Sequence, residues 1–409
     1  MIQIAVIGYG TVGSGVVEVI GKNTQEINKK AAEEVYVKYI LDLRDFPGDP
    51  YEDRVVHDID ILLNDPEIKI ICETMGGIRP AYDFTKQALS RGISVCTSNK
   101  ELVASHGPEL LRIAREHNCN YLFEASVGGG IPIIRPLNYS LTAEKIDSIV
   151  GILNGTTNFI LSKMETDGAD FGTVLKEAQE KGYAERNPEA DVEGYDACRK
   201  IAILSSLMTG KNVRFEDIYT EGITGITAAD FKYAAAMGMT IKLLAIGTMV
   251  PDADPVSKEG EKLYACVAPF MIDQNHPLYF VHDVFNAVYV HGNMLGDSMY
   301  YGRGAGKLPT ASAVVADVVD CARHIGKTIM CFWDSENMEV APMDDRVGRF
   351  FVRVAAAEAG QVKSLFGSVT EVEAMEDSEF AFICGPLSEA EFATKVEAFT
   401  QPVKRIRLA

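Results

Sequence analysis

Residues 2–13 read Ile2-Gln3-Ile4-Ala5-Val6-Ile7-Gly8-Tyr9-Gly10-Thr11-Val12-Gly13. The first six form a continuous apolar run, typical of a buried strand, and a helical apolar stripe continues from Val12 toward residue 34. A Gly-x-Gly-x-x-Gly turn between a strand and a helix is typical of dinucleotide-binding folds, because the helix N-terminus receives the pyrophosphate. We therefore expect Gly8, Gly10, Thr11, Val12 and Gly13 to bind a dinucleotide, the alternative being a plain tight turn.

The next predicted strand, residues 35–41, ends at Asp42-Leu43-Arg44. An acid at this point of the fold binds the ribose hydroxyls of NAD, whereas an arginine such as Arg44 accepts the 2′-phosphate of NADP. Because both residue types are present, the cofactor predicted here is NADP or NAD, and the choice stays open.

Strands and helices continue to alternate through residue 123, with strands expected at 68–73, 93–97 and 121–123 and helices at 80–91 and 102–117. Polar residues follow the carboxyl ends of these strands, where open parallel sheets bind ligands. The residues so placed are Thr74, Ser98, Lys100 and Glu124. They mark a candidate crevice of an α/β Rossmann domain.

The composition excludes several classes of partner. The formal net charge of −19 would repel nucleic acid and acidic membranes. The eight cysteines lie mostly in apolar runs without metal-ligand spacing, as in a reducing compartment. The chain opens on a strand rather than a signal sequence, and no apolar run approaches the roughly eighteen residues that span a bilayer. We expect a cytoplasmic protein that binds neither nucleic acid nor membrane.

Beyond Pro132 the pattern changes to that of an α+β domain. Strands are expected at 146–153, 240–250, 262–272 and 284–291, which favours a mixed or antiparallel sheet, with Asp252-Ala253-Asp254-Pro255 as a loop. A Gly-rich turn at 301–309 opens a helix, residues 310–325, that could return to the nucleotide domain. From residue 350 a β-(short α)-β-β-α-β pattern resembles a shortened ligand-sensing domain. The predicted domains are 1–135 completed by helix 309–325, then 136–308, and 345–409.

An unusually acidic loop, residues 182–194, leads into a helix in the second domain. Asp196 and Lys200 stand at i and i+4 on one face of this helix, so that they can act as a pair. A solvated ion pair is the ordinary explanation, contributing about 0.3–0.5 kcal/mol. Here Glu185 and Asp191 lie just upstream, and Lys200 leads into an apolar run where a partly desolvated amine can exchange protons near neutrality.

Taken together, several ordered stretches closely resemble the homoserine dehydrogenase family over about residues 1–325. These stretches are residues 8–13, Thr97-Ser98-Asn99-Lys100, residues 124–132, Gly151-Ile152-Leu153-Asn154-Gly155-Thr156-Thr157-Asn158, residues 182–200 and Gly302-Arg303-Gly304-Ala305-Gly306. The resemblance implies reduction of L-aspartate 4-semialdehyde to L-homoserine with a nicotinamide cofactor, at the branch point toward threonine, methionine and isoleucine. It also implies at least a homodimer, formed through the sheet of the second domain.

The resemblance also assigns roles to residues. Lys200 becomes the general acid/base, Lys100 a second catalytic candidate beside the nicotinamide, and Glu185 and Asp196 the acids that hold the substrate ammonium. Asp191 is a further acid that could orient Lys200. Solvated loop charges are the alternative for all three acids.

Three further assignments rest on the same resemblance. Glu124, with the backbone carbonyls of Val127, Gly129 and Ile131, matches a structural sodium site, for which a tight glycine turn is the alternative. Gly306 would lie near the cofactor or would serve helix packing. Longer relatives carry an ACT domain; here its first helix is expected to be short, residues 362–366, which makes amino-acid feedback doubtful.

Two rival readings stay open. Another Rossmann dehydrogenase could act on a neighbouring semialdehyde, although the sequence lacks a cysteine placed as the nucleophile of an acylating enzyme. A dinucleotide-binding redox sensor is the non-enzymatic alternative. A sensor would need neither lysine of the candidate site nor the acids around them.

Overall fold

The computed structural model describes residues 1–251 and 261–409, so the loop expected at 252–255 lies outside the described residues. The chain forms two compact units. The first contains residues 1–146, 202–216 and 292–338, and the second contains 147–201, 217–291 and 339–409.

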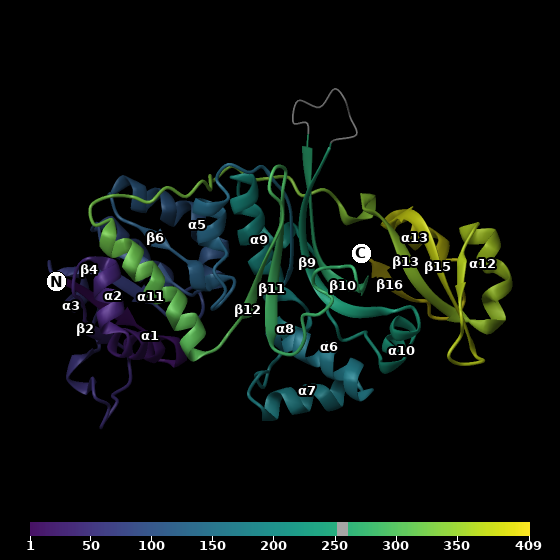
Figure 1. Cartoon of the computed structure of the whole chain (residues 1–409), viewed down its shortest axis with the longest axis horizontal. Coiled ribbons are helices and arrows are strands. Elements are labelled where there is room, and N and C mark those ends of the chain that lie inside the picture. Colours follow the sequence, from purple (N-terminus) through teal and green to yellow (C-terminus); the bar gives the residue numbers. More distant parts are fainter. Residues whose placement is uncertain (252–260) are drawn as a thin grey trace. The chain divides into compact units, whose positions relative to one another are not determined.

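The first unit is built on a parallel sheet with the order β3-β2-β1-β4-β5-β6 (Figure 1). Its strands are β1 (Ile2–Ile7), β2 (Val35–Leu41), β3 (Val55–Val56), β4 (Ile68–Glu73), β5 (Ser94–Thr97) and β6 (Tyr121–Leu122). β1 pairs with β2 on one side and with β4 on the other. This is the strand order of a dinucleotide-binding fold, with its switch point beside β1, so the predicted Rossmann architecture is confirmed.

Helices cover this sheet and share its core. They are α1 (Thr11–Lys22), α2 (Thr24–Ala31), α3 (Ile59–Leu63), α4 (Ala81–Ser90), α5 (Lys100–Glu116) and α11 (Lys307–Arg323), and the unit also contains β12 (Gly296–Arg303). α1 and α11 lie side by side (Figure 1). Their close approach depends on Gly15, where a Cβ would lie 2.8 Å from the carbonyl oxygen of Lys307. The helix predicted near 310–325 thus packs within the nucleotide-binding unit.

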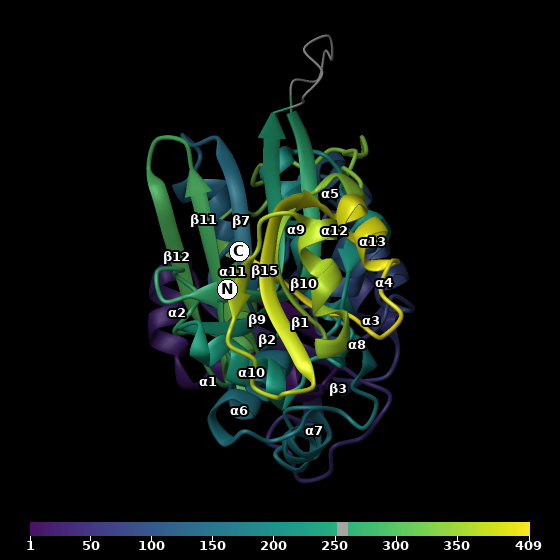
Figure 2. The ribbon, with the colours of Figure 1, turned by 90° about the vertical axis from the view of Figure 1, so that its right-hand side faces the viewer.

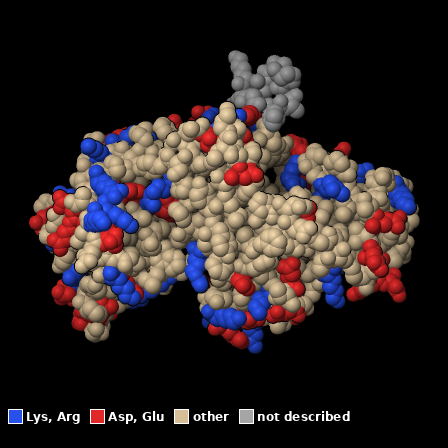
Figure 3. Space-filling view, viewed as in Figure 1, with Lys and Arg blue, Asp and Glu red and all other residues tan. Residues whose placement is uncertain are grey.

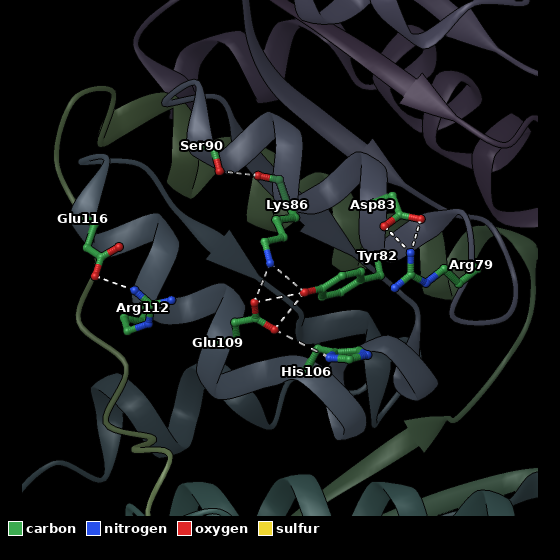
Figure 4. Close-up of polar contacts among 9 residues, drawn as sticks. All are labelled: Arg79, Tyr82, Asp83, Lys86, Ser90, His106, Glu109, Arg112 and Glu116. Carbon is green, nitrogen blue, oxygen red and sulfur yellow. Dashed lines mark hydrogen bonds and ion pairs between the residues drawn. The ribbon is translucent and has the colours of Figure 1, made fainter.

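A polar network links α4 to α5 (Figure 4). The Tyr82 hydroxyl donates to both carboxylate oxygens of Glu109 at 3.0 Å, and Lys86 Nζ donates to Glu109 Oε1 at 2.8 Å. Because the Lys86 and Glu109 side chains are about one-third exposed or more, water weakens their pairing, and we assign the network to helix packing.

The second unit contains a mixed sheet in which strands follow the order β11-β7-β9-β10-β16-β13-β15-β14, with β8 beside β10. The strands are β7 (Ile146–Ile152), β8 (Tyr219–Thr220), β9 (Met239–Pro251), β10 (Glu261–Asp273), β11 (Phe285–Gly292), β13 (Val347–Ala355), β14 (Thr370–Val372), β15 (Glu379–Ser388) and β16 (Lys404–Leu408). β9 and β10 form a long antiparallel pair (Figure 2), whereas β16 runs parallel to β10. The predicted mixed sheet is confirmed.

The helices of this unit are α6 (Gly155–Asp167), α7 (Phe171–Glu180), α8 (Glu189–Val192), α10 (Ala228–Ala236), α12 (Ala359–Phe366), α13 (Glu389–Val396) and the first turns of α9 (Tyr195–Thr209). The C-terminal order β13-α12-β14-β15-α13-β16 matches the predicted β-α-β-β-α-β pattern. The first helix was predicted too short, because α12 starts at Ala359. Packing of Val362 and Phe366 into the module's core outweighs the low helix propensity of Gly360.

In Figure 3, acidic and basic side chains are interspersed toward the two ends and the lower edge of the face shown, whereas other residues make up most of its middle. Among the described residues, no helix is long and apolar enough to cross a membrane.

Candidate functional site

The turn between β1 and α1 gives each glycine a distinct role. Gly8 has a φ of +87°, which side chains rarely adopt. A Cβ at Gly13 would lie 1.9 Å from the carbonyl oxygen of Gly8, so the helix can pack this closely against the turn only if residue 13 has no side chain. Gly10 has open space around it, and it precedes the N-terminus of α1, where Thr11 and Val12 begin the helix. The turn has the form that admits a pyrophosphate.

Thr74 supports this turn from the end of β4. Its hydroxyl donates to the carbonyl oxygens of Gly8 at 2.8 Å and Ile7 at 3.0 Å. The side chain therefore holds the turn from behind. Beside the turn is a cavity of about 410 Å³, lined by Gly8, Leu41, Asp42, Leu43, Arg44, His57, Ile59, Met75, Pro80 and Phe84.

Asp42 and Arg44 form a compact pair at this cavity. The Asp42 carboxylate accepts from Arg44 Nε and from the Tyr9 backbone N–H, at 3.0 and 2.8 Å. The hydrogen bond from Arg44 is the main reason that the pKa of Asp42 falls to about 2. Arg44 is well exposed, so its guanidinium can also meet a ligand. An acid and an arginine thus both border the cavity.

A buried carboxyl group that no sequence motif indicated lies at the end of β4. Glu73 accepts from Thr97 Oγ1 at 2.5 Å and from the Met75 N–H at 2.8 Å. The Thr97 hydroxyl in turn accepts from the N–H of Asn99, which caps α5. Burial raises the pKa of Glu73 to about 7 despite these donors. The network fixes the segment that carries Ser98 and the partly buried Lys100, first residue of α5.

Glu124, predicted as a cation ligand, is buried and accepts backbone hydrogen bonds. Its oxygens accept from the N–H groups of Ile133, Ile134 and Arg135 at 2.6 to 2.8 Å. Its own N–H donates to Asp317 on α11. The carboxylate thus anchors the segment after the glycine turn, and a cation there would depend chiefly on carbonyl oxygens.

The glycine turn at 128–130 packs backbone against backbone. A Cβ at Gly129 would lie 2.2 Å from the carbonyl oxygen of Gly304, and Gly129 itself has a φ of +57°. Val127 and Ile131, the other predicted cation ligands, are buried on either side of this turn. Gly306 has a φ of +119° and directly precedes α11. Close packing therefore accounts for Gly129, and a backbone conformation that side chains rarely adopt accounts for Gly306, in each case without a ligand.

The second unit brings three of its predicted site residues together around one asparagine. Lys200 Nζ donates to Asp196 Oδ2 at 2.7 Å and to the Leu153 carbonyl oxygen at 2.8 Å. Asn154 Nδ2 donates to Asp191 Oδ1 at 2.8 Å and to Asp196 Oδ2 at 2.9 Å. Lys200 is 8% exposed and Asp196 is 2% exposed. This is a buried, hydrogen-bonded ion pair rather than a solvated one.

The Lys200 ammonium is largely shielded from water and is held by a carboxylate oxygen and a carbonyl oxygen. Such a group can hold a proton close to a ligand and stabilise a developing oxyanion.

Glu185 is exposed in the loop between α7 and α8, where its backbone carbonyl accepts from Gln179 Nε2 at 3.1 Å. Within the described part of the chain, no hydrogen bond joins its carboxylate to the three clustered residues. Asn154 belongs to a stretch that carries the family resemblance, but the sequence analysis did not include it among the candidate site residues.

Two family descriptions match most of the chain. Residues 8–124 match "Homoserine dehydrogenase, NAD binding domain", and residues 132–319 match "Homoserine dehydrogenase". The homoserine dehydrogenase of Synechocystis sp. is 43% identical, over 87% of this chain and 83% of the relative. That of Bacillus subtilis is 41% identical, over 79% of this chain and 73% of the relative.

Solved structures agree with these sequence matches. A homoserine dehydrogenase from Thiobacillus denitrificans has a TM-score of 0.89 at 34% identity, covering 100% of this chain and 98% of that chain. A hyperthermophilic archaeal homoserine dehydrogenase in complex with NADPH has a TM-score of 0.64 at 28% identity, covering 78% of this chain and 97% of that chain.

Proposed function

Because the chain belongs to the homoserine dehydrogenase family of NAD(P)-dependent oxidoreductases, we propose that it interconverts L-aspartate 4-semialdehyde and L-homoserine. Reduction in the threonine, methionine and isoleucine pathways is the proposed direction. The observation that carries the proposal is the buried Lys200–Asp196 pair, tied to Asp191 through Asn154.

Lys200 is the proposed general acid/base. In reduction, its ammonium would stabilise the negative charge that forms on the aldehyde oxygen and would transfer a proton to that oxygen. In oxidation, the neutral amine would take the hydroxyl proton. Lys100 is the second catalytic candidate, since it starts α5 beside the Glu73 network.

Asp191 and Asp196 are the proposed anchors for the substrate ammonium, because ammonium groups bind carboxylates and both acids lie beside Lys200. Glu185 is proposed for the same role. Glu185 lies in an exposed loop, so it can bind the substrate ammonium only if this loop forms part of the substrate site.

The cofactor, when bound, supplies or accepts the hydride. The residues proposed to hold it are Gly8, Gly10, Thr11, Val12, Gly13, Arg44, Thr74, Ser98, Lys100 and Gly306. Either NAD or NADP is compatible with the cavity beside Asp42 and Arg44. The archaeal relative solved in complex with NADPH supports NADP as one of the two.

Sodium is proposed as a structural ion held by Glu124 and the carbonyls of Val127, Gly129 and Ile131. We assign the three sequence-defined segments, 1–135 with helix 309–325, 136–308 and 345–409, to cofactor binding, substrate binding with dimerisation, and an ACT-like module.

We further infer a cytoplasmic homodimer or higher oligomer. Partly exposed apolar side chains on one face of the second sheet, among them Val150, Ile246 and Tyr289, support the dimer.

The test is L-homoserine-dependent reduction of NAD+ and NADP+, with wild type compared with Lys200→Met. We expect wild type to turn over and Lys200→Met to lose at least about a thousandfold in kcat, as for loss of a proton-transfer group that also stabilises charge.

Lys163→Met is the matched control, because Lys163 forms an exposed i, i+4 pair with Asp167 on α6. It should retain wild-type kcat. Full turnover by Lys200→Met would refute the acid/base role, and a wild type inert toward homoserine with both cofactors would refute the proposed activity.

A further inference from the structure

We propose that Asn154 is a positioning residue for this reaction: its side-chain amide fixes the carboxylates of Asp191 and Asp196 and, through Asp196, the ammonium of Lys200. The inference rests on the proposed function. It concerns a residue that follows β7 and caps α6, with an exposed fraction of 6%.

The helix cap determines which way the amide points. Asn154 Oδ1 accepts from the Thr157 N–H at 2.8 Å and from the Thr157 hydroxyl at 3.1 Å. A flipped amide would place its oxygen against two carboxylates and its NH2 against a backbone N–H, which is repulsive at both ends. The NH2 group must therefore face the acids.

Both N–H bonds of that NH2 group are used, one on each acid. Asp191 lies on α8 and Asp196 on α9, so a single side chain from the start of α6 sets the relation between three helices. The neighbouring Leu153 carbonyl accepts from Lys200 Nζ. Two consecutive residues thus constrain two of the three N–H bonds of the Lys200 ammonium.

Residue type explains why an amide is needed here. Serine, threonine, aspartate and asparagine all cap helices well, so capping alone does not require asparagine. A hydroxyl would keep the cap without reaching two acids. An aspartate would keep the cap but place a third carboxylate within hydrogen-bonding distance of two others, where charges repel. Asparagine alone combines the capping acceptor with two donors.

Two variants separate positioning from capping. Asn154→Ser keeps the cap and removes both donors, and we expect kcat for homoserine oxidation to fall about tenfold or more, with the KM for NAD(P)+ within about twofold of wild type. Asn154→Asp should lose more activity at high pH than at low pH, because protonation of the added carboxyl removes the repulsion and restores one donor. If Asn154 served only as a helix cap, the activity of Asn154→Asp relative to wild type would be the same at high and low pH.

Asp170→Ser at the N-cap of α7 is the matched control, since Asp170 accepts from the Thr173 N–H and lies away from the acids. It should leave kcat unchanged. Full activity of Asn154→Ser, with Lys200→Met inactive, would overturn the positioning role while leaving the proposed function intact. The positioning role would also be overturned if, in both Asn154 variants, activity fell only as much as the amount of folded protein fell. A wild type inactive toward homoserine would instead refute the proposed function on which it rests.

Discussion

Glu73 gives the nucleotide-binding unit a pH-dependent contribution to stability. Burial raises the pKa of this carboxyl from 4.5 to about 7. Between these values the folded protein holds a proton that the unfolded chain has lost, so the stabilisation is present at low pH and disappears as pH rises through 7. We predict that the free energy of unfolding of wild type, relative to Glu73→Gln, falls by about 2 kcal/mol from pH 5.5 to 8.

Urea unfolding of both proteins at the two pH values measures this difference. Glu26→Gln is the control, because Glu26 is exposed on α2 and should show no such trend. A constant difference between wild type and Glu73→Gln would show that the carboxyl is ionised throughout this range.

The turn between β1 and α1 yields a prediction at the level of an element. Gly13→Ala would force a Cβ to within 1.9 Å of the Gly8 carbonyl oxygen, so turn and helix must separate. We expect a loss of about 3 kcal/mol in the free energy of unfolding. At Gly10 the φ of −84° suits alanine and the space is open, so Gly10→Ala should keep its stability.

The same pair of variants separates folding from binding. The methyl group of Gly10→Ala would enter the space through which the backbone approaches the pyrophosphate, and we expect the Kd for NAD(P)H to rise about tenfold. Fluorescence titration with NADH and NADPH measures this. Unchanged affinity in Gly10→Ala would contradict the placement of the pyrophosphate at this turn.

The elements themselves were largely predictable, because alternating apolar runs and helical stripes follow from burial on the sheet. β12 was missed because its sequence, Gly-Asp-Ser-Met-Tyr-Tyr-Gly-Arg, lacks a continuous apolar run, and its residues alternate between partial and full exposure. The site was only partly predictable. Asp196 and Lys200 are one helical turn apart, but Asn154 and Asp196 are 42 residues apart, and only the folded chain brings them together.

At the scale of the whole molecule, the C-terminal module is joined to the middle of the chain within the second unit. Arg353 on β13 donates to Asp230 Oδ1 of α10 at 2.5 Å and to Glu379 Oε1 of β15 at 2.8 Å. Arg353 is 6% exposed and Asp230 is 1% exposed. Removing one partner of a buried ion pair leaves the other charge uncompensated, which typically costs about 3–5 kcal/mol.

We therefore predict that Arg353→Met destabilises the second unit by about that amount, whereas Arg349→Met, at an exposed position of the same strand, changes stability by less than about 0.5 kcal/mol. Because the proposed cofactor residues belong to the first unit, Arg353→Met should lose homoserine oxidation at a lower temperature than wild type while binding NAD(P)H with unchanged Kd below that transition. Thermal inactivation and cofactor titration measure the two effects separately. The contrary result would be a cofactor affinity that falls in parallel with activity at temperatures where the protein is folded. The substitution at Arg353 would then also affect the nucleotide-binding turn, and the two units would not be independent in stability.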